Sequence, residues 1–257
     1  MLSKENFSPA RLKTLRIGVI AGAGYSVEDF LYVQNTIGSH FTLMSSLGQT
    51  ECTAGLTVCN IDDPIEIKST TVGHFMNHVE GKIADMNTGA PLPAGETGEI
   101  CVRGYLTMQR YYGDAAETAK TLDADGWVHT GDLGALDANG NITLKGRCKE
   151  LIIRGGENIS PLEIEQALAA NPAVALCKVI GVPDRHFGEE VCACIIRAPG
   201  AELDADAVRG WLRPRIAYFK IPRYVVFYDE LPKTHKGAVS TAECKKLAMR
   251  DLFGTEG

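Results

Sequence analysis

The sequence has no block or stripe of basic residues. Its 26 lysines and arginines are mixed with 32 aspartates and glutamates, which gives a net charge of −6. Because nucleic-acid-binding proteins gather positive charge on one face, this distribution argues against a nucleic-acid partner. No apolar run approaches the ~18 residues of a membrane span, and Met1–Lys13 has no apolar core such as a secretory signal peptide needs. We therefore expect a cytoplasmic protein without a membrane span.

The sequence also lacks a metal-binding cysteine pattern. Its eight cysteines include no Cys-x-x-Cys pair, and no histidine lies at a spacing that completes a zinc site. Several cysteines lie in apolar runs such as Val191–Ile195, so we expect reduced, buried thiols. His129, His186 and His235 are scattered along the chain, and we expect none of them to be catalytic.

The organisation of the chain is α/β at first and then β-rich. A length of 257 residues corresponds to about two ordinary domains. Arg16–Ala21 is typical of a buried strand, Val27–Ile37 of an amphipathic helix, and Thr42–Met44 of a short strand. From Lys82 onward, short alternating strands are separated by turn clusters, with one helix near residues 115–121.

The last third of the sequence predicts an α+β domain that begins near Cys148. Ser160 and Ser240 each stand three residues before a glutamate, the capping-box spacing that starts a helix. Pro161 fits the first position of its helix. The further elements expected here are helices at 161–170 and 205–212 and strands at 175–182, 191–197 and 224–228.

Residues 127–166 carry the most informative pattern in the chain. A Thr-Gly-Asp turn is followed by a hairpin, an arginine and a lysine, an apolar strand, a double glycine and a helix start. Asp132 can accept two hydrogen bonds from a vicinal diol such as a ribose. Arg147 adds a planar, permanently charged donor for ribose oxygens, carboxylate or phosphate. Gly155 and Gly156 let the backbone approach a ligand closely.

This pattern resembles the C-terminal half of the AMP-forming acyl- and aryl-CoA synthetases, members of the adenylate-forming superfamily. The resemblance extends from about residue 15 to 246, and the other matching stretches, in chain order, are residues 48–51, 95–100, 181–184, 218–223 and 231–234. It implies an α/β and α+β fold. Residues 1–147 would be the end of a large N-terminal domain, with a sheet remnant and a small β-barrel subdomain at about 65–147. Residues 148–257 would be a small, mobile C-terminal domain.

The resemblance also implies a ligase of fatty acid metabolism. Such an enzyme converts a fatty or aryl carboxylic acid, ATP and coenzyme A into acyl-CoA, AMP and pyrophosphate. The residues it assigns to the nucleotide are Gly22, Ala23, Gly48, Gln49, Thr50, Asp132 and Arg147. Glu51 would help to hold Mg²⁺, which prefers oxygen ligands.

Further roles follow from the same resemblance, and some alternatives stay open. Lys149 would be the hinge about which the C-terminal domain rotates. The loop that admits the pantetheine arm of coenzyme A would contain Gly155, Gly156 and Glu157. An ordinary glycine turn explains residues 22–24 equally well. Lys220 and Arg223 are interpreted as solvated cations in preference to ligands of coenzyme A phosphates.

Two features of the family pattern are missing from this sequence. The Ser/Thr/Gly-rich phosphate loop with its lysine does not occur, and the only early glycine cluster, residues 22–24, lacks a Gly-Lys-Ser/Thr ending. Ala238 occupies the position of the C-terminal catalytic lysine, with Lys236 two residues earlier. We therefore expect a C-terminal fragment or shortened member that is inactive in adenylation alone. The alternative is a non-catalytic nucleotide-binding or interaction protein, which could bind AMP weakly or pair with a separate N-terminal half.

Overall fold

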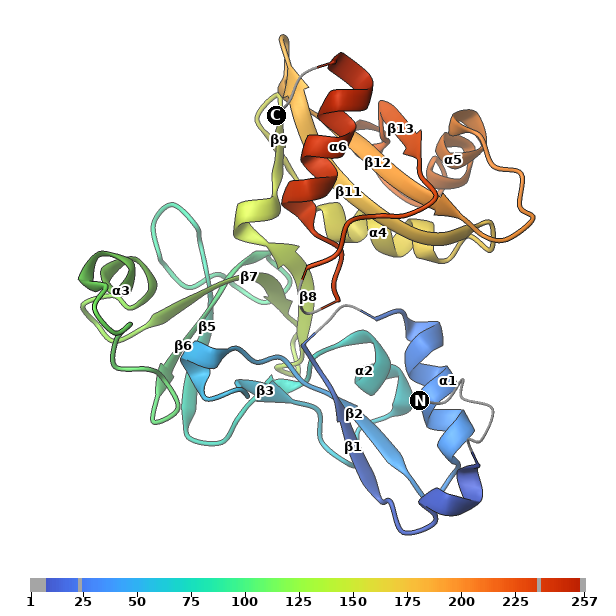
Figure 1. The fold of residues 1–257 in the computed structure, drawn as a ribbon. Coiled ribbons are helices and arrows are strands. Elements are labelled where there is room, and N and C mark those ends of the chain that lie inside the picture. Colours follow the sequence, from blue (N-terminus) through green and yellow to red (C-terminus); the bar gives the residue numbers. More distant parts are fainter. Residues whose placement is uncertain (1–7, 23–24, 235–236, 255–257) are drawn as a thin grey trace. The chain divides into compact units, whose positions relative to one another are not determined.

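The computed structural model describes residues 8–22, 25–234 and 237–254. The chain divides into two compact units, Met1–Lys145 and Gly146–Gly257, and Figure 1 labels their α-helices and most of their strands. No helix within the described ranges is long and apolar enough to cross a membrane.

The first unit begins with a parallel strand pair connected by a helix. β1 (Ile17–Ile20) pairs with β2 (Thr42–Ser45), and α1 (Val27–Ile37) connects them. The expected helix is confirmed, and its start is a capping box in which Ser26 and Asp29 bond reciprocally to each other's backbone.

The interpretation of β1 as a buried strand is wrong. Ile17 and Val19 are 45% and 56% exposed. Ile20, on the opposite face of the strand, packs against the cluster formed with α1. Successive side chains of a strand point to opposite faces, and the described elements cover only one face of this strand pair.

The β-rich part of the first unit is a four-stranded sheet. Its strands pair in the order β5 (Val79–Ala84), β6 (Gly98–Gly104), β7 (Val128–Leu136) and β8 (Ile142–Arg147). Buried apolar residues from all four strands form one core cluster, with Ile83, Ile100, Val128 and Ile142 among them. Within the described strands this order is open, because no pairing of β5 with β8 closes it into a barrel.

Shorter elements complete the first unit. They are η1 (Pro9–Leu12), η2 (Thr50–Cys52), β3 (Thr57–Val58), α2 (Ile65–Thr70), β4 (His74–Phe75) and α3 (Ala115–Thr121). The sequence predicted α3, which begins where the Asp114 side chain accepts a hydrogen bond from Glu117 N. It gave no signal for α2, whose N-cap residue, Pro64, makes no side-chain cap.

The second unit is built on a five-stranded sheet. Its strands are β9 (Ile152–Arg154), β10 (Glu157–Ile159), β11 (Val174–Asp184), β12 (Gly188–Arg197) and β13 (Tyr224–Phe227). β12 pairs with β11 and β9 in antiparallel fashion and with β13 in parallel. Its other elements are η3 (Cys148–Glu150), α4 (Pro161–Ala169), α5 (Ala205–Leu212), η4 (Tyr218–Lys220) and α6 (Thr241–Phe253).

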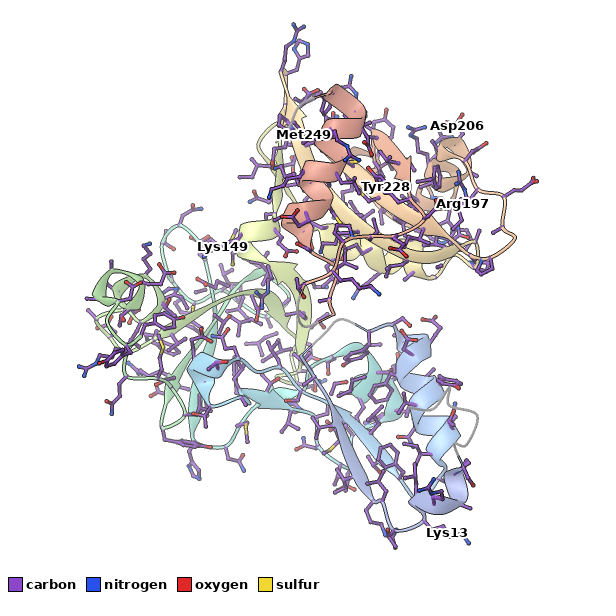
Figure 2. The ribbon with its side chains drawn as sticks, in the orientation of Figure 1. Lys13, Lys149, Arg197, Asp206, Tyr228 and Met249 are labelled. Carbon is purple, nitrogen blue, oxygen red and sulfur yellow. The ribbon has the colours of Figure 1, made fainter. Side chains whose placement is uncertain are left out.

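Both faces of this second sheet are buried, as β12 shows. Val191, Ala193 and Ile195 belong to a core cluster with residues of α4 and α5. Cys192 and Cys194 alternate with them and belong to a second cluster with residues of α6. Tyr228 and Met249, labelled in Figure 2, pack against this second cluster. The apolar run of β12 follows from burial on both sides.

Of the two predicted capping boxes, Ser240 forms its half of one, while its own N donates to the carbonyl of Pro232, and Ser160 forms no side-chain cap. Ser240 accepts a hydrogen bond from Glu243 N at the start of α6. Ser160 precedes α4 but makes no side-chain cap. The partner expected of it, Glu163, instead lies 2.6 Å from Nζ of Lys220. A nearby cation therefore replaces the local hydrogen bonds that the sequence spacing predicts.

Candidate functional site

The Thr-Gly-Asp segment is a bulge inside a strand, and the expectation of a tight turn is wrong. β6 and β7 pair at Glu99–Leu133 and again at Cys101–His129. The segment 130–132 of β7 therefore stands opposite Ile100 alone, which is a β-bulge. Gly131 has a φ of 71°, a left-handed conformation that glycine adopts without a steric penalty.

Hydrogen bonds hold this bulge against β6. The hydroxyl of Thr130 donates to the carbonyl of Ile100 at 2.7 Å, and Asp132 N donates to the same hydroxyl oxygen at 3.1 Å. Gly131 N donates to Oε1 of Glu99 at 2.9 Å. Asp132 itself is only 4% exposed, so the bulge places a carboxylate in a mostly buried position.

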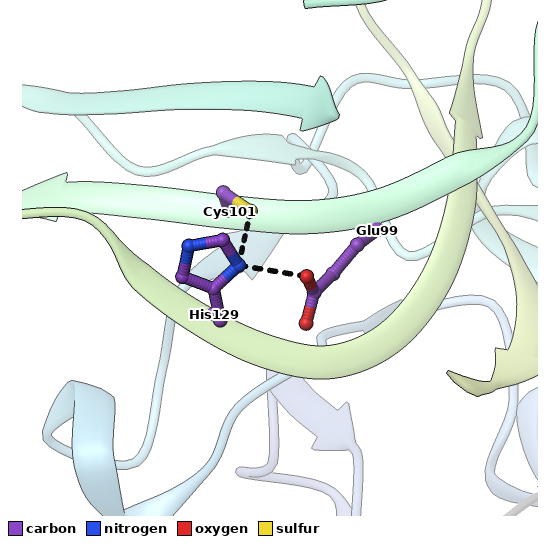
Figure 3. Close-up of side chains that lie close together, drawn as sticks. All are labelled: Glu99, Cys101 and His129. Carbon is purple, nitrogen blue, oxygen red and sulfur yellow. Dashed lines mark hydrogen bonds and ion pairs between the residues drawn. The ribbon is translucent and has the colours of Figure 1, made fainter. Parts of the chain in front are cut away.

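Figure 3 shows the side chains beside the bulge, Glu99, Cys101 and His129. Nδ1 of His129 lies 2.8 Å from Oε2 of Glu99 and 3.6 Å from Sγ of Cys101. On the other side of the ring, Nε2 lies 3.6 Å from Oδ2 of Asp123. Within the described ranges, Glu99, Cys101 and His129 form the one group whose ligand atoms, all within 4.8 Å of one another, could hold a metal ion.

Sequence spacing could not reveal this cluster. Cys101 and His129 are 28 positions apart and meet because they pair in register across β6 and β7. The only available signal was the match of residues 95–100, which includes Glu99, to the adenylate-forming pattern.

The loop from Gly48 to Glu51 is shaped by close backbone contact. A Cβ at Gly48 would lie 1.6 Å from the carbonyl oxygen of Ala54, so only glycine fits. Gln49 accepts hydrogen bonds at its carbonyl from Cys52 N and Ala54 N, both at 3.0 Å. Thr50 opens η2 and Glu51 follows it.

Glu51 presents a carboxylate of the kind that a hard divalent cation prefers. Its Oε1 accepts a hydrogen bond of 2.7 Å from the hydroxyl of Tyr111. This hydrogen bond is the main reason why the pKa of Tyr111 is raised. The carboxylate is therefore oriented by a neighbour 60 positions away in the chain.

Among the remaining predicted residues of the first unit, Gly22 has a φ of 81°, and nothing lies within 4 Å of an added Cβ. The need for glycine at position 22 therefore comes from its backbone conformation and not from crowding. Ala23, assigned to the nucleotide with Gly22, lies outside the described residues.

Arg147 and Lys149 are exposed residues at the start of the second unit. Arg147 ends β8, and Lys149 lies in η3. The boundary between the compact units falls between Lys145 and Gly146, close to the expected boundary between residues 147 and 148.

Gly155 and Gly156 form the two-residue loop of a hairpin between β9 and β10. Arg154 pairs with Glu157 across this hairpin, and the two glycines have φ values of 59° and 91°. Short hairpin loops that match the twist of their strands need positive φ at both central positions. Gly155 N also donates to the carbonyl of Phe187 at 2.8 Å, which ties the loop to the turn between β11 and β12.

The cations near this hairpin are paired with carboxylates. Arg154 lies 2.8 Å from Oε1 of Glu190, which is buried. Arg223 lies 3.1 Å from Oδ2 of Asp184. Lys220 is paired with Glu163, so both cations that could meet coenzyme A phosphates, Lys220 and Arg223, are engaged within the unit.

The described residues that flank positions 235 and 236 approach one another before α6. Thr234 N donates to the carbonyl of Ala238 at 2.7 Å, and Lys233 and Val239 form a bridge. Lys236, the expected substitute for the lysine, lies outside the described residues.

Comparison with family models matches both parts of the chain. The model described as AMP-binding enzyme matches residues 1–112. The model described as AMP-binding enzyme C-terminal domain matches residues 163–238.

Similar curated proteins are named as acyl-CoA ligases. The medium-chain acyl-CoA ligase ACSF2, mitochondrial, of Macaca fascicularis is 36% identical over 253 residues, which are 98% of this chain and 41% of that protein. The putative acyl-CoA synthetase YngI of Bacillus subtilis is 38% identical over 238 residues, 93% of this chain and 43% of that protein. The chain thus spans about two fifths of the length of these relatives.

Solved structures of similar fold contain adenine nucleotides. ATP-bound MatB from Rhodopseudomonas palustris aligns with a TM-score of 0.87 and 31% identity, over 96% of this chain and 48% of that one. The o-succinylbenzoate CoA synthetase MenE of Bacillus subtilis, in complex with the acyl-adenylate intermediate OSB-AMP, aligns with a TM-score of 0.79 and 28% identity, over 90% and 46%.

Proposed function

The chain belongs to the family of AMP-binding enzymes, and from this we propose that it carries the ribose-binding and thioester-forming parts of an AMP-forming acyl-CoA synthetase. The reaction joins a fatty or aryl carboxylic acid to coenzyme A and uses ATP. The observation that carries the proposal is the bulge in β7, whose hydrogen bonds fix the backbone at the buried carboxylate of Asp132. The names of the relatives support the reaction class.

In the first unit, each proposed role follows from side-chain chemistry. Asp132 accepts hydrogen bonds from the ribose hydroxyls, while the loop at Gly48 and Gln49 and the backbone at Gly22 and Ala23 lie along the nucleotide. Thr50 contacts the α-phosphate. Glu51 fits a Mg²⁺ ligand because it offers an oriented carboxylate, and the ion would neutralise phosphate charge.

In the second unit, Arg147 supplies a charged donor to the ribose. The hairpin loop at Gly155 and Gly156, followed by Glu157, admits the pantetheine arm, since it has no side chain over two positions. Lys149 is proposed as a hinge because it lies four residues after the last residue of the first unit. The proposed domains remain residues 1–147 and 148–257, and cytoplasmic location stays a prediction, since similar ligases include a mitochondrial one.

The same assignment implies a weak adenylation step. Ala238 stands where the family pattern has a lysine that would meet the carboxylate and phosphate. A methyl group cannot stabilise developing negative charge. Ala238 also favours a second candidate function, a protein that binds AMP without catalysis or pairs with a separate N-terminal half.

AMP binding to the 257-residue chain tests the proposal by isothermal titration calorimetry. We expect Asp132→Asn to weaken AMP binding by ~10-fold to ~100-fold, the scale of hydrogen bonds to a charged group. Asp137→Asn is the matched control, because Asp137 lies just beyond the end of β7 and bonds within its own turn. If the unmodified chain binds no AMP, or both variants bind equally well, the proposal is wrong.

A further inference from the structure

One carboxylate, that of Glu99, bonds to the backbone of β7 where the strand departs from regular pairing. Its Oε1 accepts the hydrogen bond of Gly131 N at 2.9 Å. Its Oε2 lies 2.8 Å from Nδ1 of His129. Gly131 is the middle residue of the bulge and His129 immediately precedes it. Glu99 therefore holds this part of β7 at two points.

The bulge needs such support from outside its own residues. Gly131 has a left-handed φ of 71° and no side chain that packs, so its backbone has many conformations open to it. The bond from Asp132 N to the Thr130 hydroxyl is local and moves with the bulge. The bonds to β6 are different, because Ile100, next to Glu99, is fully buried in the core.

His129 orients the Glu99 carboxylate and is itself held on both sides. Its Nε2 lies 3.6 Å from the Asp123 carboxylate, and Cys101 Sγ lies 3.6 Å from Nδ1. Because a carboxylate only accepts hydrogen bonds, the contact with Glu99 requires a proton on Nδ1, and the Asp123 carboxylate faces the other side of the ring. The Glu99 oxygen that faces Gly131 is thereby fixed in place.

We propose that Glu99 is a positioning residue that fixes the backbone carrying Asp132, with His129 orienting its carboxylate. This inference rests on the proposed function, since it is through Asp132 that Glu99 affects nucleotide binding.

A metal centre is the competing use of the same side chains. Glu99, Cys101 and His129 place their ligand atoms within 4.8 Å of one another. A metal ion on Nδ1 would displace the hydrogen bond between His129 and Glu99. Both Glu99 oxygens already accept or face nitrogen donors, so hydrogen bonding accounts for the arrangement.

The first measurement needs no nucleotide. Amide hydrogen exchange at Gly131 is followed by NMR in the 257-residue chain and its Glu99→Ala, Glu99→Gln and Glu80→Ala variants. Glu80 is the matched control: it pairs with Arg103 at 2.6 Å between β5 and β6 of the same sheet but is exposed. We expect Gly131 to exchange ~10-fold faster or more in Glu99→Ala only. Glu99→Gln keeps an acceptor for Gly131 N and a donor for a neutral His129.

The second measurement is AMP affinity of the same four proteins, with the free energy of unfolding recorded separately. We expect Glu99→Ala to bind AMP ~10-fold more weakly, and Glu99→Gln to stay within ~3-fold of the unmodified chain because its hydrogen bonds survive. If Glu99 had a purely structural role, Glu99→Ala would have a lower free energy of unfolding, and Glu99→Gln would not restore the AMP affinity.

The outcomes separate this inference from the proposed function. If the chain binds AMP and Glu99→Ala binds it equally well, or if Gly131 exchange does not change, positioning by Glu99 is wrong. If no protein binds AMP but Gly131 exchange rises in Glu99→Ala alone, the ribose site is wrong and the support of the bulge stands. A loss of affinity in Cys101→Ala that a chelator reproduces in the unmodified chain would replace the positioning network with a metal centre.

Discussion

The two units differ in how completely their sheets are buried and in how much of the family's site pattern they keep, and neither unit is ahead in both. The second unit buries both faces of its sheet beneath α4, α5 and α6, but it carries Ala238 where the family pattern has a lysine. The first unit leaves Ile17 and Val19 of β1 exposed, yet it keeps the Thr-Gly-Asp bulge with its hydrogen bonds. Burial of the core and retention of the family's site pattern are therefore separate properties, and each can be tested without the other.

The largest effect expected from this comparison is in folding. Residues 146–257 should fold alone, because both core clusters of that unit are made from its own residues. Residues 1–145 should associate or aggregate, because β1 presents apolar side chains and, among the described strands, pairs only with β2. Amide NMR spectra of the two pieces check this. Collapsed peaks from residues 146–257, or a monomer of residues 1–145 by light scattering, would contradict the comparison.

A matched pair of isoleucines measures the same contrast in the whole chain. Ile195 is fully buried in β12 and Ile17 is 45% exposed in β1. Ile195→Ala should lower the free energy of unfolding by about 2–5 kcal/mol because it leaves a cavity. Ile17→Ala should change it by less than about 1 kcal/mol. Urea denaturation gives both values, and equal losses would show that Ile17 is covered in solution.

These contrasts also mark what the sequence could reveal. The helices predicted near residues 115–121 and at 205–212 are confirmed as α3 and α5, and their caps, Asp114 and Asp204, lie next to the helices that they start. Burial of β1 was mispredicted, since an apolar pattern does not show whether a second layer covers it.

The candidate site was less predictable than the helices for a related reason. The importance of Asp132 came from its motif, but its bulge depends on the register between β6 and β7. Glu99 and His129 meet only through that register. Ser160 likewise lost its predicted partner when Glu163 paired with Lys220, 57 positions away. Long-range contacts of this kind leave no local pattern.

One substitution in the second unit should restore the adenylation step. With the N-terminal half of a complete relative fused before the chain, we expect slow acyl-CoA formation from acid and ATP, and faster formation from a presynthesised acyl-adenylate. Ala238→Lys should raise the adenylation step by ~10²-fold, the scale of an electrostatic contact to developing charge. The thioester step, which uses the loop at Gly155 and Gly156, should change little.

The control for this substitution is Lys236→Ala in the same fusion. ATP–pyrophosphate exchange reports adenylation, and release of AMP from the acyl-adenylate reports the thioester step. If Ala238→Lys has no effect and Lys236→Ala abolishes exchange, Lys236 performs the role of the missing lysine, and the second unit is chemically complete after all.

The smallest expected effect is a fall in stability at high pH. The two units should behave alike in this respect, because both bury thiols. Burial raises the pKa of Cys52 in the first unit to about 11 and that of Cys177 in the second to about 12, from 9.0. A thiol whose pKa is higher in the folded chain than in the unfolded chain contributes its full stabilisation below the unfolded pKa of about 9. This contribution is lost as the pH rises toward the pKa of the folded chain. Stability should therefore fall between pH 9 and 11 by at most ~1.4 kcal/mol per pH unit for each thiol. Urea denaturation at several pH values should show a shallower fall in both Cys52→Ala and Cys177→Ala than in the unmodified chain. A flatter profile in only one of the two variants would mean that the units differ in how tightly their interiors exclude water, and would extend the contrast between them from the sheets to the thiols.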